Sequence, residues 1–210
     1  NFFYQAYLNL KNLADELVNS GYNVPTLDLG GGIGIHYDNN KVPNFSNYKS
    51  IISDLFTNTD YKLNFEPGRS LIAEAGILIT KVIRNKKTKD KNFIIVDAAM
   101  NNLIRPTLYE AFHNIEPINK TNRSKILTDV VGPICETGDY IALDRKINKV
   151  ENDELLAIRT TGAYSSVMRS NYNTRPDAKE IIIYDKKDYL IREPETIRDL
   201  ISKEKIINFD

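Results

Sequence analysis

The chain has 210 residues, 41% of them apolar and 27% charged, and its 28 basic side chains equal its 28 acidic ones in number. These values are typical of a globular protein and exclude a disordered or fibrous chain. A formal net charge of zero argues against a nucleic-acid binder that depends on phosphate neutralisation, and no apolar run reaches the ~18–20 residues that span a bilayer.

The first third of the chain alternates predicted helices with short predicted strands. Apolar residues at three- and four-residue spacing predict a helix from Phe3 to Leu17 that ends at Asn19-Ser20-Gly21. A strand over 24–29 follows, then a helix that Ser46 can cap, then a strand over 62–66. This order is typical of parallel βα units.

The rest of the chain has a different pattern. Short runs rich in Ile, Val, Leu and Tyr are separated by polar turns such as 85–87 and 148–153, which predicts a mainly antiparallel β-domain. Pro194 opens a predicted closing helix, which can pack back on the first domain. We therefore assign 1–75 to the end of an α/β unit and 76–210 to a β-domain. The predicted strands are 77–83, 93–97, 129–134, 140–143, 155–159 and 180–184, the last within a hairpin over 181–191.

Two loops at the ends of the predicted parallel strands form the first candidate site. The triglycine Gly30-Gly31-Gly32 can take positive φ and bring backbone N–H groups to an anion. Its spacing is not a dinucleotide fingerprint, and a bare glycine cluster is more often a tight turn. The next loop, Glu66-Pro67-Gly68-Arg69, adds a carboxylate and a guanidinium. Because the carboxyl ends of parallel strands share one edge, the two loops predict an anion site, for phosphate especially.

A third motif contains Arg105 and Tyr109, four residues apart. In a helix the two would lie on one face and could share a carboxylate ligand. A helix that starts at Pro106 and leaves Arg105 in solvent fits the spacing equally well. His113 lies one turn further and is, by itself, more often structural than catalytic.

Two further positions complete the set of candidates. The only cysteine, Cys135, lies between a Gly-Pro turn and an acid-rich turn, and it is either a small buried hydrophobe or a reactive thiol. As a lone cysteine it excludes a disulfide framework within the chain and indicates a reducing compartment, so we expect a cytoplasmic protein. Tyr164 could donate to a ligand or be a buried tyrosine with a satisfied hydroxyl.

Together, in this order and spacing, these motifs resemble those of the diaminopimelate decarboxylases. These belong to the fold-type III family of pyridoxal-phosphate decarboxylases, which includes ornithine and arginine decarboxylases. The resemblance runs from Leu27 to Asn173. It implies a TIM-like α/β barrel that binds pyridoxal 5'-phosphate, a C-terminal β-domain of the alanine racemase/decarboxylase type, and a homodimer with active sites at the interface. The implied reaction converts meso-2,6-diaminopimelate to L-lysine and CO2. It implies no metal.

The resemblance also implies roles for the matching residues. Glu66 would keep the pyridine nitrogen of the cofactor protonated. Cys135 would protonate the carbon that loses CO2, and Glu136 would bind the distal ammonium of the substrate. Both residues would act across the dimer interface. The implied cofactor-binding residues are Gly30, Gly31, Gly32, Glu66, Pro67, Gly68, Arg69 and Tyr164. The implied substrate-binding residues are Arg69, Arg105, Tyr109, Glu136 and Tyr164.

One element of the family pattern has no match in the chain. The lysine that forms the Schiff base with the cofactor lies upstream of the matched motifs in the family, and the chain starts at Asn1 without an initiator Met. We therefore expect this chain alone to be inactive, either as the C-terminal part of a normal enzyme or as a truncated homologue with a binding or regulatory role. The Arg105–Tyr109 motif favours diaminopimelate over ornithine or arginine, whose decarboxylases are the remaining alternative.

Overall fold

The computed structural model describes residues 2–35, 37, 44–119 and 122–209. The chain divides into two compact units, Asn1–Glu74 and Ala75–Asp210, and each has its own hydrophobic core. Among the helices that the structure describes, none has the length and apolar character needed to cross a membrane.

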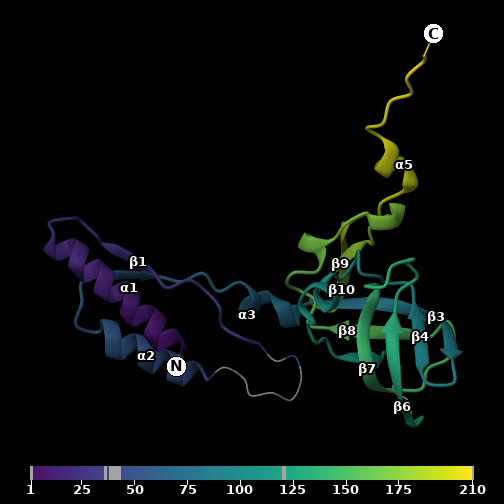
Figure 1. The fold of residues 1–210 in the computed structure, drawn as a ribbon, viewed down its shortest axis with the longest axis horizontal. Helices are drawn as coiled ribbons and strands as arrows, with labels where there is room; N and C mark the ends of the chain where they lie inside the picture. The colour runs from purple at the N-terminus through teal and green to yellow at the C-terminus, as the bar shows by residue number, and fades with distance from the viewer. Residues whose placement is uncertain (1, 36, 38–43, 120–121, 210) are drawn as a thin grey trace. The chain divides into compact units, whose positions relative to one another are not determined.

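The first unit contains a parallel pair of strands, two longer helices and a third helix of one turn (Figure 1). Strands β1 and β2 pair in register from Thr26 with Lys62 to Asp28 with Asn64, which confirms the parallel βα prediction. The helices α1 and α2 pack on each other. The elements are α1 (Phe2–Asn19), β1 (Thr26–Asp28), α2 (Phe45–Phe56), β2 (Lys62–Asn64) and α3 (Arg69–Ile72), followed by a 3-10 turn, η1 (Ala73–Ala75).

The core of this unit follows from the apolar spacing of its helices. Helix α1 buries Tyr7 and Ala14, and α2 buries Ile51 and Leu55. The hydroxyl groups of Tyr7 and Tyr48 lie 2.8 Å apart, so the buried phenol has a hydrogen-bond partner. The two helices therefore bury apolar side chains, and the buried hydroxyl of Tyr7 is paired.

The boundaries of the two helices test two sequence predictions. Helix α1 ends as expected, since Gly21 has a φ of +90° that favours glycine after a helix. The predicted cap Ser46 is wrong. Asn44 caps α2 instead, because its side-chain oxygen accepts hydrogen bonds from the backbone N–H groups of Ser46 (2.9 Å) and Asn47 (3.2 Å).

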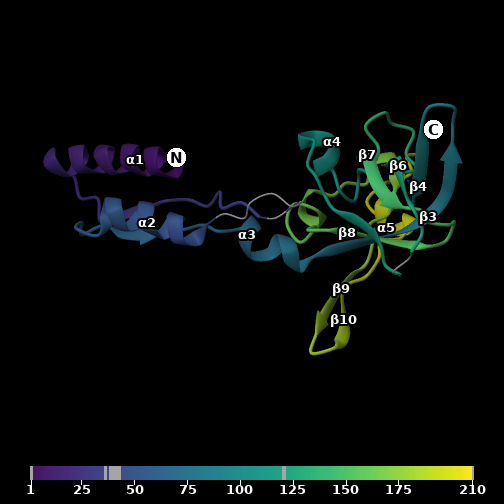
Figure 2. The same cartoon turned by 90° about the horizontal axis from the view of Figure 1, so that it is seen from below.

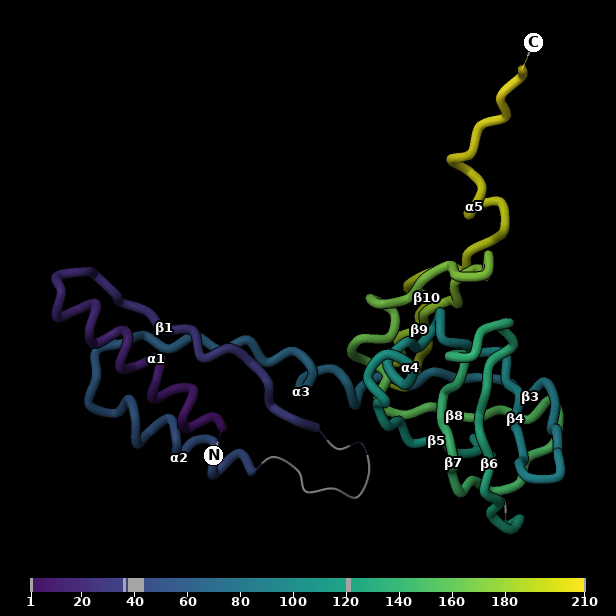
Figure 3. The backbone as a smooth tube through the Cα atoms, in the orientation of Figure 1, coloured from purple at the N-terminus to yellow at the C-terminus, as the bar shows by residue number. Residues whose placement is uncertain are grey.

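The second unit is built on a six-stranded sheet with the order β5-β8-β3-β4-β6-β7. Its neighbouring strands are antiparallel except for β4 and β6, which confirms a mainly antiparallel domain and adds one parallel pair. Figure 3 shows the neighbouring strands β6 and β7 running side by side. The strands are β3 (Ile77–Lys87), β4 (Asn92–Val96), β5 (Ile115–Pro117), β6 (Lys125–Val131), β7 (Tyr140–Asn148) and β8 (Leu155–Arg159).

Shorter elements complete the second unit. The predicted hairpin is confirmed and consists of an antiparallel pair, β9 and β10. Helix α4 packs beside β7 (Figure 2), and α5 is held by a capping box between Thr196 and Asp199. This cap, rather than Pro194, starts the closing helix. The bounds are α4 (Arg105–Tyr109), η2 (Ser166–Met168), η3 (Tyr172–Thr174), β9 (Glu180–Tyr184), β10 (Lys187–Arg192) and α5 (Ile197–Ile201).

Several strand boundaries differ from those predicted. The segment 85–87, predicted as a turn, continues β3, and the turn comes at Thr88, whose N–H donates to the Lys91 carbonyl (2.8 Å). Strand β6 starts at Lys125 and ends at Val131, before a Gly-Pro turn, so the predicted strand over 129–134 was displaced. At 85–87 an exposed polar stretch continues the strand because β4 supplies backbone partners, and 125–128 joins β6 because it pairs with β7.

Candidate active site

The glycine loop and the Glu66 loop are held together by their backbones. They follow the paired strands β1 and β2, and the Glu66 N–H donates to the Gly30 carbonyl (2.8 Å). Gly30 and Gly32 have φ values of +67° and +78°, which favour glycine. At Gly31, a Cβ would lie 2.3 Å from the Glu66 carbonyl oxygen. Only glycine therefore permits this approach of the two loops.

The side chains of these loops differ in their surroundings. Glu66 is exposed. Arg69 begins α3, and its guanidinium carbon lies 5.9 Å from the ring centroid of Tyr37. The N–H of Gly30 already donates to the Asp28 carboxylate (2.7 Å). The loop thus combines a fixed backbone with an accessible carboxylate.

In the second unit, Arg105 is buried and points at His113. Only 6% of Arg105 is exposed, so the alternative of a solvated Arg105 is wrong. Its Nη1 lies 3.0 Å from Nε2 of His113, and its guanidinium carbon lies 5.9 Å from the ring centroid of Tyr164. Tyr109 is 61% exposed, so the two residues of the Arg-Pro-x-Leu-Tyr motif differ in burial. The structure brings Arg105 and Tyr164 together.

The loop that carries Cys135 is fixed by Asp139. The carboxylate of Asp139, itself buried, accepts hydrogen bonds from the backbone N–H groups of Met100 and Ile134, both at 2.7 Å. A Cβ on Gly132 would lie 2.3 Å from this carboxylate, so the residue there must be glycine. Cys135 itself is exposed. The loop is therefore anchored at its base and presents the thiol to solvent.

Two contacts connect this loop with its surroundings. Thr107 on α4 donates its hydroxyl to the Gly138 carbonyl (2.5 Å). The Tyr172 hydroxyl donates to the Glu136 carboxylate (3.3 Å), whose negative charge is the main reason that the pKa of Tyr172 is raised. Glu136 thus lies beside a hydroxyl donor.

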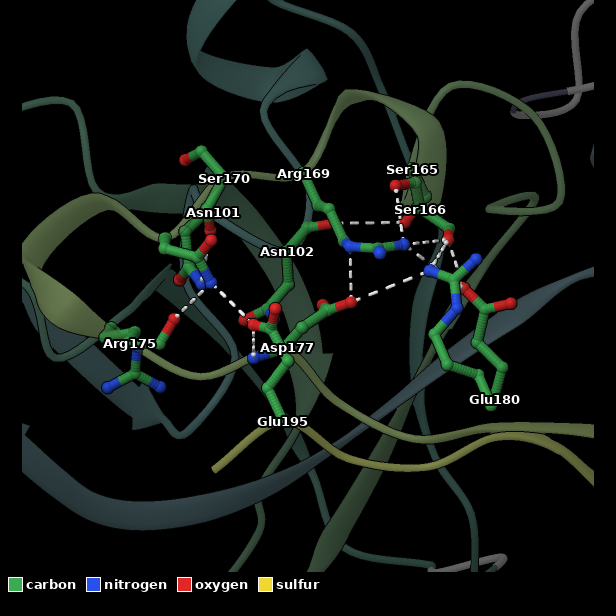
Figure 4. Close-up of polar contacts among 12 residues, drawn as sticks. Asn101, Asn102, Ser165, Ser166, Arg169, Ser170, Arg175, Asp177, Glu180 and Glu195 are labelled. Carbon is green, nitrogen blue, oxygen red and sulfur yellow. Dashed lines mark hydrogen bonds and ion pairs between the residues drawn. The ribbon is translucent and has the colours of Figure 1, made fainter. Parts of the chain in front are cut away.

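A network of ion pairs holds the segment that follows Tyr164 (Figure 4). Arg169 pairs with the buried carboxylate of Asp177 and donates to the Ser166 hydroxyl (3.0 Å). Ser166 in turn donates to Glu180, the first residue of β9. Burial raises the pKa of Asp177, although the Arg169 charge opposes this shift. The network joins this segment to the hairpin.

A comparison with known families assigns the chain. Residues 8–162 match the family model described as "Pyridoxal-dependent decarboxylase, C-terminal sheet domain". The chain belongs to the pyridoxal-dependent decarboxylase family. This assignment confirms the family resemblance and the α/β-plus-β fold class, with a C-terminal sheet domain, predicted from the sequence.

Individual members of this decarboxylase family are similar over most of the chain. A diaminopimelate decarboxylase from Aquifex aeolicus is 44% identical over 91% of the chain, which covers 46% of that protein. One from Pseudomonas aeruginosa is 42% identical over 98% of the chain, which covers 49% of it. The crystal structure of diaminopimelate decarboxylase from Helicobacter pylori complexed with L-lysine is 38% identical with a TM-score of 0.89, over 96% of this chain and 50% of that one. The chain spans about half the length of the relatives it matches.

Several residues of this site could not be predicted from the sequence. His113 was set aside because a lone histidine carries little signal, and its contact with Arg105 depends on packing. Asp139 belongs to the acid-rich turn that follows Cys135, and its position four residues after the cysteine is the available signal. The hydrogen bond from Tyr172 to Glu136 joins residues far apart in the chain, so no local pattern predicts it.

Asp139→Asn is expected to loosen the cysteine loop. The amide keeps one acceptor oxygen but turns an NH2 group toward a backbone N–H, so one buried hydrogen bond is lost at a cost of about 1–3 kcal/mol. Faster hydrogen–deuterium exchange at Met100 and Ile134 and a lower free energy of unfolding are the expected results in a full-length protein that contains this chain. The matched control, Asp188→Asn on the exposed strand β10, should change neither. Unaltered exchange at both amides would contradict the anchoring role.

Proposed function

We propose that the chain is part of a diaminopimelate decarboxylase. This enzyme would remove CO2 from meso-2,6-diaminopimelate to give L-lysine, with pyridoxal 5'-phosphate as cofactor. The observation that carries the proposal is the identity of 42–44% with proteins of that name over nearly the whole chain. We also propose a cytoplasmic homodimer, and that residues 1–75 close an α/β barrel.

The glycine loop fits the phosphate group of pyridoxal phosphate. Phosphate binding needs backbone N–H groups that can approach an anion without a side chain in the way. The positive φ angles at Gly30 and Gly32 and the close packing of Gly31 on the Glu66 carbonyl supply such a turn. Because the Gly30 N–H is used by Asp28, we assign the phosphate contacts mainly to Gly31 and Gly32.

Other residues of the two loops would bind the ring and the phosphate of the cofactor. Bound pyridoxal phosphate supplies an electron sink for the electron pair of the broken bond. Glu66 would accept a hydrogen bond from the pyridine N–H and keep that nitrogen protonated, and its exposed carboxylate is suited to this. Gly68 would add a further amide contact beside Pro67, and Tyr164 would donate its hydroxyl.

The substrate would be recognised at its distal end. Arg69, Arg105 and Tyr109 would bind the distal carboxylate, and Glu136 the distal ammonium. Arg105 matters most for selectivity because its guanidinium is buried: losing one partner of a buried charged contact costs about 2–5 kcal/mol. Ornithine and arginine lack a distal carboxylate and would leave Arg105 without this partner, which disfavours them.

Cys135 would donate a proton to the carbon that has lost CO2. The thiol lies exposed on a loop whose base is fixed by Asp139, so it can reach a molecule outside its own unit. In the proposed homodimer, Cys135 and Glu136 of one subunit would complete the site of the partner. The proton must be on sulfur at that moment.

The proposed function is tested by substrate competition. A full-length protein that contains this chain, supplied with pyridoxal phosphate, is assayed for CO2 release from meso-diaminopimelate, ornithine and arginine. We expect kcat/KM for diaminopimelate to be larger by a hundredfold or more, as about 3 kcal/mol of discrimination implies. The 210-residue chain alone should release no CO2, because none of its lysines lies in the family's Schiff-base motif. Equal use of ornithine, or no formation of lysine, would contradict the proposal.

A further inference from the structure

His113 is buried between two defined partners. None of its surface is exposed. Its Nε2 lies 3.0 Å from Nη1 of Arg105, and its Nδ1 lies 2.9 Å from the carbonyl oxygen of Arg159, the last residue of β8. The imidazole therefore connects the guanidinium of Arg105 to a strand of the central sheet.

The identity of these partners determines which nitrogen carries the proton. A guanidinium has only donors, so the Arg105 Nη1–H must donate and Nε2 must accept through its lone pair. A carbonyl oxygen has only lone pairs, so Nδ1 must carry the proton and donate it to Arg159. Both bonds are satisfied only by the neutral ring with the proton on Nδ1.

The charges around the ring favour the same form. Burial, as the largest cause, lowers the pKa of His113 to about 4, and the positive charges of Arg105 and Arg145 act in the same direction. The hydrogen bond with the Arg159 carbonyl opposes them. A second proton would place a cationic ring against two guanidinium groups. The ring thus stays neutral at physiological pH and remains an acceptor.

A purely structural role for His113 would need only one of its two hydrogen bonds, the one to the Arg159 carbonyl. The hydrogen bond to the Arg159 carbonyl closes the end of β8 and would be sufficient to hold the loop. The bond to Arg105 does something else: it directs one side of a buried, planar guanidinium, so that the remaining N–H groups have a defined direction. This second contact connects His113 to ligand binding.

We propose that His113 is a positioning residue that orients the guanidinium of Arg105 for the distal carboxylate of the substrate. This rests on the proposed function, in which Arg105 binds that carboxylate. His113 touches neither substrate nor cofactor, and it acts by fixing the rotamer of Arg105. Without it, the buried guanidinium loses the hydrogen bond to Nε2 and the direction that this bond gives it, so substrate binding weakens while the chemistry of CO2 loss is unaffected.

Two substitutions separate the two hydrogen bonds. His113→Asn can place an amide N–H near the position of Nδ1 and so keeps the bond to the Arg159 carbonyl, but it loses the acceptor for Arg105. His113→Gln reaches the position of Nε2 and keeps that acceptor. In the full-length holoenzyme we expect Asn to raise KM for meso-diaminopimelate about tenfold to a hundredfold, as for a lost hydrogen bond to a charged group, with little change in kcat. Gln should restore KM to within about threefold of wild type. A higher KM in the Gln variant than in the Asn variant would overturn the proposal.

A second measurement does not depend on activity. In 15N-histidine-labelled full-length protein, the ring signals of His113 are identified by their loss in His113→Gln. We expect the neutral Nδ1–H tautomer with no titration near pH 6.5, and a shift of the Nε2 signal in Arg105→Lys. A proton on Nε2 would overturn the proposal even if the enzyme is active. If the wild type released no CO2, the proposed function would fail, and the tautomer would still decide whether His113 orients Arg105.

Discussion

Replacement of Arg105 by alanine is expected to raise KM for meso-diaminopimelate by about thirtyfold or more. The reason is the burial of the guanidinium, since loss of a buried charged contact costs about 2–5 kcal/mol. Arg105→Lys keeps the charge but loses the planar fork, so an intermediate KM is expected. Steady-state kinetics on the full-length holoenzyme give KM for the substrate, and absorbance titration gives the affinity for the cofactor.

We expect Arg105→Ala to weaken substrate binding much more than cofactor binding. Arg123→Ala is the matched control, because Arg123 pairs with Glu154 at the surface of the same unit, and KM should then change little. If Arg105→Ala weakened cofactor and substrate to the same extent, Arg105 would be a structural residue and the distal-carboxylate assignment would be wrong.

Cys135→Ala should lower kcat by about 10²–10⁴-fold, the usual contribution of a positioned general acid. Because the thiol is exposed, its removal should cost little stability and leave the cofactor absorbance in place. Thr137→Ala, an exposed position on the same loop, controls for loop effects. Single-turnover measurement of CO2 release and of product protonation distinguishes the loss of CO2 from the later protonation of the carbon. Unchanged turnover in Cys135→Ala would remove the thiol from the acid role.

Local patterns predicted the elements that form within a short stretch of chain. The three- and four-residue spacing in α1 and the hairpin β9–β10 are confirmed because each depends on a short stretch of chain. Strand β5 has only three residues and was missed, since it forms by pairing with β8. The extension of β3 to Lys87 was missed because Asn85, Lys86 and Lys87 are polar and exposed, a composition typical of a turn. Long-range pairing, which leaves no local pattern, decided the case of β5, whereas an exposed polar composition hid the extension of β3.

The candidate site also contains a part that the local sequence predicts and a part that depends on contacts between distant segments. The glycine loop could be predicted from its sequence, and its close contact with Glu66 explains why Gly31 must be glycine. The roles of Arg105 and Cys135 came from the family resemblance and stay predictions. The burial of Arg105 and its bond to His113 could not be predicted, because three separate segments of the chain meet there.

The position of β8 in the sheet has a consequence for synthesis of the protein. β8 is the last of the six strands in the chain, yet it lies between β5 and β3 and pairs with both. At roughly 5–20 residues per second, a ribosome needs several seconds to proceed from the end of β5 to the end of β8. During that time the edges of β3 and β5 present unpaired backbone groups that can join another chain. A nascent chain that stalls before Leu155 is therefore a target for chaperones, and release of the chain at that stage would favour aggregation.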